Sequence, residues 1–285
     1  MRAVYSLFVH PTWPLQGALL LPGNSSMSAL FDSFGIALGL VAFMVAYLLI
    51  GIPIKLAGSQ RVGKTYGAVF YLGAPCYSPL SWDRSPKFSP KLIWPAVRSL
   101  LFWAIHCAAA YSVYWYLVIN YEPSPLQRSY MALLPFYAFS ETFAAVLRIF
   151  FLPTGWVLCP VHARPLLAPS LSKFWGRYWN RWVSDWLRHL IFAPLLRTPY
   201  RAAFAVFVIS GLWHEIVLEL PYYLAGHSPT FGSMTLFFLL QGLALILEPK
   251  LIRSRPVLRR IYGLIAVIVP SPLLFNDAFL WAFML

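Results

Sequence analysis

Long apolar stretches alternate with short polar ones along almost the whole chain. A helix needs about 20 apolar residues to cross a bilayer. By this measure the pattern predicts six membrane-spanning helices, at 35–55, 98–120, 129–150, 201–222, 233–248 and 261–282. Residues 1–22 are also apolar but are broken by prolines, and we interpret them as a further membrane segment, because no small-residue cleavage site follows a clean apolar core.

The period of the pattern changes between the third and fourth predicted spans. Within 170–190, apolar residues recur at spacings of three and four, with cationic and polar residues between them; the apolar positions are Trp175, Trp179, Trp182, Trp186 and Leu190. This pattern predicts one amphipathic helix, with a serine after Pro169 able to cap its first amides. Two interpretations are open: the helix lies flat in the membrane interface, or its cationic face also binds the phosphates of a cytosolic cofactor such as coenzyme A.

Composition agrees with a membrane protein, since 60% of the residues are hydrophobic and only 11% are charged. Ordinary soluble domains carry about 25% charged residues. We therefore expect an all-α, polytopic integral membrane protein with about six to eight transmembrane helices and a cytoplasmic amphipathic helix. The 285 residues leave little room for a soluble domain, so 1–285 is predicted to be a single membrane-embedded domain.

The net charge of +13 is not spread evenly. Most of the Lys and Arg residues fall in 55–98, 164–201 and 250–260, and the predicted spans place all three segments on one side of the membrane. By the positive-inside rule that side is cytoplasmic. This distribution argues against nucleic acid as a partner and favours a multi-pass membrane protein. We expect its location to be the endoplasmic reticulum.

The cysteines and histidines show no metal-binding pattern. Cys76, Cys107 and Cys159 are widely spaced and odd in number, and no histidine, His162 included, has partners at metal-ligand spacing. We expect no disulfide framework and no metal.

The most informative polar residues are His214 and Glu215, which lie inside the apolar stretch 202–218. An ionisable side chain at membrane depth costs roughly 2.5–3.5 kcal/mol, so it usually faces a cavity, a partner or a substrate. A buried reaction site is the leading hypothesis, with a structural buried hydrogen bond as the alternative. Glu141 and Arg148, seven residues apart in one predicted span, are interpreted as an internal pair, or as an arginine reaching the interface.

Two sequence runs resemble a known family. The run Phe-Trp-Gly-Arg-Tyr-Trp-Asn at 174–180 is followed about 30 residues later by Phe-Val-Ile-Ser-Gly-Leu-Trp-His-Glu at 207–215. Together they resemble the signature of the wax-synthase-like branch of the membrane-bound O-acyltransferases, specifically over 165–220. This branch includes plant wax synthases and fungal acetyltransferases that acylate terpenoid hydroxyls. The chain is shorter than such proteins, which leads us to expect that amino-terminal spans are missing.

The resemblance implies transfer of an acyl group from acyl-CoA to an alcohol, with His214 as the catalytic base. Asn180 occupies the family's second polar position. Histidine suits the task because its ordinary pKa of about 6.5 leaves it neutral at working pH. Asn180 has an amide that can donate to the oxygen of the thioester carbonyl as negative charge builds there.

Supporting roles are expected for Glu215 and Ser210. Neighbouring residues on a helix point about 100° apart, so we expect Glu215 to join a buried polar network, such as one with an arginine from another span, rather than to orient His214. Ser210 lies on the same helix face as His214 and is expected to hydrogen-bond its ring; an acyl-accepting role for Ser210 is a weaker alternative.

We expect acyl-CoA as co-substrate, with acetyl-CoA preferred, and no permanently bound cofactor. Trp175, Arg177 and Arg181 are the candidate residues for binding it. Three functions remain open: an O-acetyltransferase acting on a lipophilic secondary metabolite such as a terpenoid, a long-chain wax-ester synthase, and a non-enzymatic membrane scaffold or transporter. Bulky residues near His214, among them Trp213 and Phe207, favour the short acyl group.

Overall fold

The structure is a computed structural model, and it describes residues 52–53, 55–56, 89–154, 158–195, 197–252 and 255–285. These residues form helices joined by short loops, and no β-strand occurs among them. The predicted all-α membrane fold is thereby confirmed. The predicted amino-terminal segment and most of the predicted span at 35–55 lie outside the described residues.

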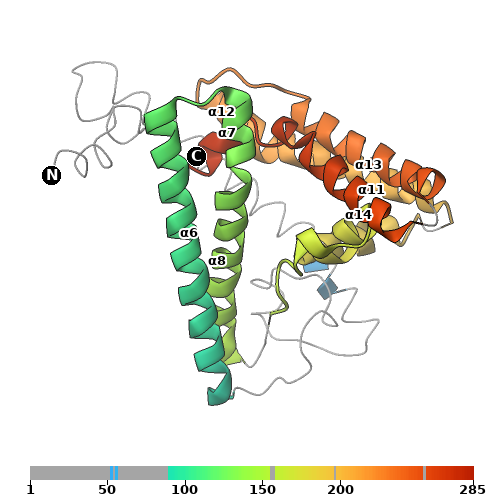
Figure 1. Ribbon diagram of the computed structural model, residues 1–285. Helices are drawn as coiled ribbons and strands as arrows, with labels where there is room; N and C mark the ends of the chain where they lie inside the picture. Colours follow the sequence, from blue (N-terminus) through green and yellow to red (C-terminus); the bar gives the residue numbers. More distant parts are fainter. Residues whose placement is uncertain (1–51, 54, 57–88, 155–157, 196, 253–254) are drawn as a thin grey trace.

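The first described unit is an antiparallel helical hairpin. It comprises α6 (Ile93–Tyr121), the short α7 (Pro125–Met131) and α8 (Leu133–Phe151), and α6 lies along α8 in Figure 1. Ser124 starts α7 with a reciprocal cap: its hydroxyl accepts the Gln127 amide, and the Gln127 side chain accepts the Ser124 amide at 2.8 Å. Much of α6 exposes large apolar side chains, as expected for a helix that faces lipid.

The second unit is a layer of three helices that lies beside the hairpin (Figure 1): α11 (Pro199–His214), α13 (Ser233–Leu251) and α14 (Pro256–Ile268). A π-helical turn, η8 (Glu215–Glu219), and α12 (Leu220–Leu224) continue α11. The backbones of α11 and α13 approach closely, because a Cβ on Gly211 would lie only 2.8 Å from the Cα of Thr235. Small residues at such crossings are typical of membrane helices.

Four helical stretches of the described part are long and apolar enough to cross a membrane: Pro90–Tyr121, Pro125–Phe151, Pro199–Leu224 and Pro256–Leu273. Three of them match predicted spans. The last begins and ends earlier than predicted, because Pro270 and Pro272 interrupt the chain and Asn276 caps a separate short helix, α15 (Asp277–Ala282). The apolar part of α13, Ser233–Pro249, is shorter than a full span.

Residues 171–192 form two short helical stretches instead of the single amphipathic helix expected at 170–190. The first comprises α9 (Leu171–Lys173) and the π-helical turn η6 (Phe174–Tyr178). The second comprises α10 (Arg181–Leu187) and the π-helical turn η7 (Arg188–Phe192). The break lies at Asn180, which has a left-handed conformation with φ of 33°. Asparagine tolerates this conformation better than most residues. As a result the tryptophans do not form one continuous stripe.

Segment 171–192 is anchored to the three-helix layer at its start. Glu248 of α13 is fully buried and accepts the amides of Leu171 at 2.8 Å and Ser172 at 3.3 Å. A Cβ on Gly263 of α14 would lie 2.9 Å from the Leu171 nitrogen. These contacts fix the position of the Phe-Trp-Gly run relative to α13 and α14.

Two buried clusters join the hairpin to the rest of the chain. The first packs Ala144 and Phe151 of α8 against Leu158, Val161 and Trp182. The second surrounds Phe279 of α15 and includes residues of α6, η8 and α13; its buried members are Tyr114, Val118, Ala132, Leu218, Met234, Phe275, Ala278, Phe279 and Leu280. The remaining short elements are 3-10 turns at Pro90–Leu92, Leu152–Thr154, Pro165–Leu167 and Ser271–Leu273.

Candidate active site

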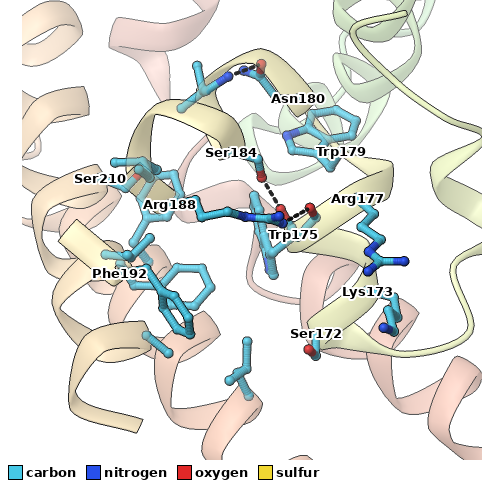
Figure 2. Close-up of a pocket in the computed structure, with 18 of the residues that line it drawn as sticks. Ser172, Lys173, Trp175, Arg177, Trp179, Asn180, Ser184, Arg188, Phe192 and Ser210 are labelled. Atoms are coloured by element: carbon cyan, nitrogen blue, oxygen red, sulfur yellow. Dashed lines mark hydrogen bonds between the residues drawn. The ribbon is translucent and has the colours of Figure 1, made fainter. Parts of the chain in front are cut away.

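A cavity of about 520 Å³ lies among α8, the segment 161–192, α11, α13 and the chain before α15. A volume of this size suits a drug-sized ligand. His214, Asn180, Ser210, Trp175 and Arg177 all line it, although they come from elements far apart in the sequence. Two further residues singled out from the sequence, Glu215 and Arg181, do not line this cavity. Figure 2 shows part of the lining.

His214 is the last residue of α11 and is followed directly by the π-helical turn η8. Its Nδ1 lies 2.7 Å from the backbone carbonyl oxygen of Ser210. Because a carbonyl only accepts hydrogen bonds, Nδ1 carries the proton and the neutral ring keeps a lone pair on Nε2. No described residue hydrogen-bonds to Nε2. The ring packs on Phe238 with a centroid separation of 4.7 Å.

Ser210 therefore makes the expected contact with the His214 ring, and it does so through its main-chain carbonyl. Its hydroxyl is buried but lines the cavity, one helical turn before His214. The arrangement leaves His214 in the cavity wall with a basic nitrogen that has no hydrogen-bond partner among the described residues.

Glu215 points away from His214 and toward α13. Its Oε1 accepts the amide of Thr235 at 2.9 Å, and Thr235 is the third residue of α13. A carboxylate at this place satisfies a free amide and is favoured by the positive end of the helix dipole. Its Oε2 is buried and has no hydrogen-bond partner among the described residues, so the arginine partner that we considered is not found there.

Asn180 is held by its own backbone conformation and by a cap. Its Oδ1 accepts the amide of Val183 at 3.3 Å at the start of α10. Within the described part of the chain, its amide nitrogen makes no hydrogen bond. The Asn180 side chain thus uses its acceptor for structure and keeps its NH2 group available at the cavity wall.

A second histidine, His162, lines the same cavity, and sequence reasoning missed it. Its Nδ1 lies 3.2 Å from Oε1 of Glu141 on α8, and both side chains are buried. Its ring packs on Trp179 at 4.3 Å between centroids. We had interpreted Glu141 and Arg148 as a pair; instead Glu141 binds His162, and Nε and Nη2 of Arg148 are buried without a hydrogen-bond partner among the described residues. The carboxylate of Glu141, alone in an apolar span, indicates in the sequence that a buried partner exists. The sequence does not indicate that this partner is His162.

One end of the cavity is cationic. Lys173, Arg177 and Arg188 are exposed and line it, and Figure 2 shows all three around the Phe-Trp-Gly turn. Arg188 Nη2 donates to the carbonyl of Gly176 at 3.1 Å, and the Ser184 hydroxyl donates to the carbonyl of Trp175. These bonds fix the π-helical turn that carries Trp175 and Arg177.

The remaining wall is apolar. Trp175 packs against Phe207, Phe237 and Phe238, and its Nε1 donates to the buried Gln241 at 3.2 Å. Its indole is therefore a fixed wall rather than a free donor. Other apolar lining residues are Phe136, Val206, Leu245, Leu274 and Phe279. Among the described residues, no group of three or more His, Cys, Asp or Glu side chains could hold a metal ion.

Comparison with known proteins agrees with the motifs. Residues 158–240 match the model of the Membrane bound O-acyl transferase family. The matched range contains His162, Asn180 and His214. The resemblance to the wax-synthase-like membrane-bound O-acyltransferases is thereby confirmed, while the narrower likeness to fungal acetyltransferases stays a prediction.

Individual relatives come from plants. In Arabidopsis thaliana, Probable long-chain-alcohol O-fatty-acyltransferase 7 is 33% identical over 146 residues, which cover 46% of this chain and 42% of the relative. Probable long-chain-alcohol O-fatty-acyltransferase 2 is 33% identical over 165 residues, covering 53% and 47%. The Long-chain-alcohol O-fatty-acyltransferase of Simmondsia chinensis is 34% identical over 119 residues, covering 37% and 33%. The chain spans less than half the length of these curated relatives.

Proposed function

We propose that this protein is an acyl-CoA-dependent O-acyltransferase that esterifies a lipophilic alcohol inside the membrane. The observation that carries the proposal is the joint position of His214 and Asn180 on one cavity, the first with a free Nε2 and the second with a free amide NH2. The non-enzymatic alternatives, a scaffold or a transporter, would give no reason for this combination.

The chemistry follows from these two groups. Nε2 of His214 takes the proton of the alcohol as its oxygen attacks the carbonyl carbon of the thioester. The NH2 group of Asn180 donates to the carbonyl oxygen as negative charge develops there. A positioned base contributes about 10²–10⁴-fold in rate, and one such donor about 10²–10³-fold.

The cationic end of the cavity supports coenzyme A as the carrier. Its phosphates would lie near Lys173, Arg177 and Arg188, where water remains accessible. The thin pantetheine arm would then enter past Trp175 toward His214. Arg181 does not line the cavity. It would contact a phosphate only if that phosphate extended along α10 beyond the cavity.

The printed names of the relatives favour a fatty acyl group and a long-chain alcohol. We therefore propose a fatty acyl-CoA as donor. Transfer of an acetyl group to a secondary metabolite such as a terpenoid is the alternative, favoured by the aromatic side chains of Phe207 and Phe238 around His214. An endoplasmic reticulum location fits both, because the substrates are lipophilic and the donor is cytosolic.

The test is ester formation by the membrane-inserted chain, with labelled palmitoyl-CoA and acetyl-CoA offered in competition together with a long-chain alcohol. We expect a labelled palmitoyl ester from the wild type and a loss of about 10²–10⁴-fold in His214→Ala. His106→Ala is the matched control, since the Nδ1 of His106 makes the same bond to a carbonyl four residues earlier, Phe102, at 2.7 Å, but the residue is exposed on α6 and away from the cavity.

The outcomes separate the candidates. If the acetyl ester were the main product, the donor would be acetyl-CoA, as in the short-chain alternative. No ester from either donor, or equal activity in His214→Ala and the wild type, would overturn the proposal.

A further inference from the structure

Acyl exchange between a thioester and an alcohol involves two proton transfers, and the proposed base accounts for one of them. The alcohol loses a proton, and the departing thiolate of coenzyme A gains one. We propose that His162, held by Glu141, is a second acid–base residue of this cavity and protonates the departing sulfur. This inference rests on the function proposed above.

His162 lies beside Asn180 in the cavity wall. The amide of Ala163 donates to the carbonyl of Tyr178, and the amide of Arg181 donates to the carbonyl of Val161, each at 2.8 Å. These two bonds flank both His162 and Asn180, so the backbone fixes the two residues next to each other. If Asn180 binds the thioester oxygen, His162 is in the same region as the bond that breaks.

The partner of His162 differs from that of His214. The Nδ1 of His162 faces a buried carboxylate, while the Nδ1 of His214 faces a neutral carbonyl. A carboxylate balances a positive charge that forms on the ring it contacts, whereas a neutral carbonyl does not. Two titratable groups in such different settings are the usual basis for dividing acid and base roles in one site.

The free edge of His162 faces the cavity. Glu141 is 4% exposed and His162 is 5% exposed, and His162 is the member of the pair that lines the cavity. No described residue hydrogen-bonds to Nε2 of His162. Packing on Trp179 and on Tyr137, at 4.3 and 5.1 Å between centroids, holds the ring plane. His162 therefore presents one defined nitrogen to a substrate.

The proposed step balances as follows. The alcohol proton moves to Nε2 of His214, the new C–O bond forms, and the C–S bond breaks with its electron pair moving to sulfur. The proton on Nε2 of His162 moves to that sulfur, which leaves as the neutral thiol. His214 then carries one extra proton and His162 lacks one, and water that enters after product release carries the proton back between them.

The test uses the leaving group. His162→Gln is compared with the wild type on two donors with the same acyl chain, an alkyl thioester and an aryl thioester. An aryl thiolate is a far weaker base and leaves without a proton. We expect kcat of His162→Gln to fall about 10²-fold or more with the alkyl thioester, and the loss to be much smaller with the aryl thioester. Glu141→Gln, which keeps a hydrogen-bond acceptor, should show the same selectivity to a lesser degree.

His214→Ala serves as the reference, because loss of the base should slow both donors alike. Equal slowing of both donors in His162→Gln and in Glu141→Gln would overturn the inference and assign the pair to structure. If His162→Gln does not fold, the donor selectivity of Glu141→Gln decides alone. A wild-type protein that makes no ester from either donor would instead overturn the proposed function, and this inference with it.

Discussion

Asn180 shows how one side chain can serve both the fold and the proposed chemistry. Its backbone is left-handed, its Oδ1 caps α10, and its NH2 group is free at the cavity. An aspartate tolerates the same backbone conformation and keeps the acceptor. Asn180→Asp therefore removes the donor without removing the cap.

We expect Asn180→Asp to keep a thermal unfolding midpoint close to that of the wild type while losing about 10²–10³-fold in kcat, because the oxyanion loses its donor and meets a negative charge. The measurement is ester formation together with a melting curve in the same detergent. Asn120→Asp is the control: Asn120 is exposed on α6, where its amide donates to the Tyr116 carbonyl at 2.7 Å. Full activity in Asn180→Asp would show that the NH2 group of Asn180 takes no part in the reaction.

The contact between His162 and Glu141 could not be predicted from the sequence. The two are 21 positions apart and lie on different elements, so no spacing rule connects them. The pair Glu141 and Arg148, in contrast, has a helical spacing and was the natural interpretation. Only the approach of segment 158–163 to α8 brings the histidine to the carboxylate.

At the scale of elements, the position of His214 depends on how α11 packs on α13. Gly211 lets the two backbones approach, and Glu215 caps the start of α13 one turn later. Phe204 and Phe207 of α11 in turn pack over Gly242 of α13, where an added Cβ would lie 3.0 and 3.3 Å from their rings. His214 thus lies on a helix whose position against α13 is set by contacts in its middle and at its C-terminal end.

Gly211→Ala is expected to destabilise the protein by about 1–3 kcal/mol, the usual cost of overpacking. The added Cβ would lie 2.8 Å from a backbone atom, the Cα of Thr235, which no rotamer change can move. The midpoint of thermal unfolding measures the effect. Gly176→Ala is the matched control for stability, since nothing lies within 4 Å of a Cβ built there; an equal loss in both variants would contradict the close packing.

The helices that the sequence predicts well are those with long, uninterrupted apolar runs. The predicted spans at 98–120, 129–150 and 201–222 correspond to α6, to α7 with α8, and to α11 with its continuation. The break at Asn180 was not predicted, because tryptophan spacings of three and four also occur across two short helices. The π-helical turns have no sequence signal of this kind, yet two of them adjoin Asn180 and His214.

At the scale of the whole molecule, the described part contains a hairpin and a three-helix layer (Figure 1). The cavity is lined by residues of α8 from the hairpin, and of α11 and α13 from the layer. The cationic residues of the cavity, Lys173, Arg177 and Arg188, come from segment 171–192, while His214 lies 16 residues into α11. A donor with a charged end and an apolar end would bind in one orientation. The charge distribution along the chain predicts that its charged end faces the cytoplasm.

This orientation can be tested on the two ends of one span. Pro199–Leu224 contains 26 residues, a length of roughly 39 Å at 1.5 Å per residue, which exceeds a hydrocarbon core of about 30 Å. The span is therefore long enough to place its two ends on opposite sides, as the predicted topology requires. Thr198 and Ser228 flank the span and are exposed, and the turn at 225–232 carries no Lys or Arg.

We expect Thr198→Cys to react with a membrane-impermeant maleimide in sealed endoplasmic reticulum microsomes, and Ser228→Cys to react only after detergent is added. The background replaces Cys76, Cys107 and Cys159 with serine, so that each variant has one thiol. Labelling of both variants in detergent controls for access. The reverse pattern would place the cationic end of the cavity in the lumen, and because acyl-CoA is cytosolic, it would also separate Lys173, Arg177 and Arg188 from the donor that we propose they bind.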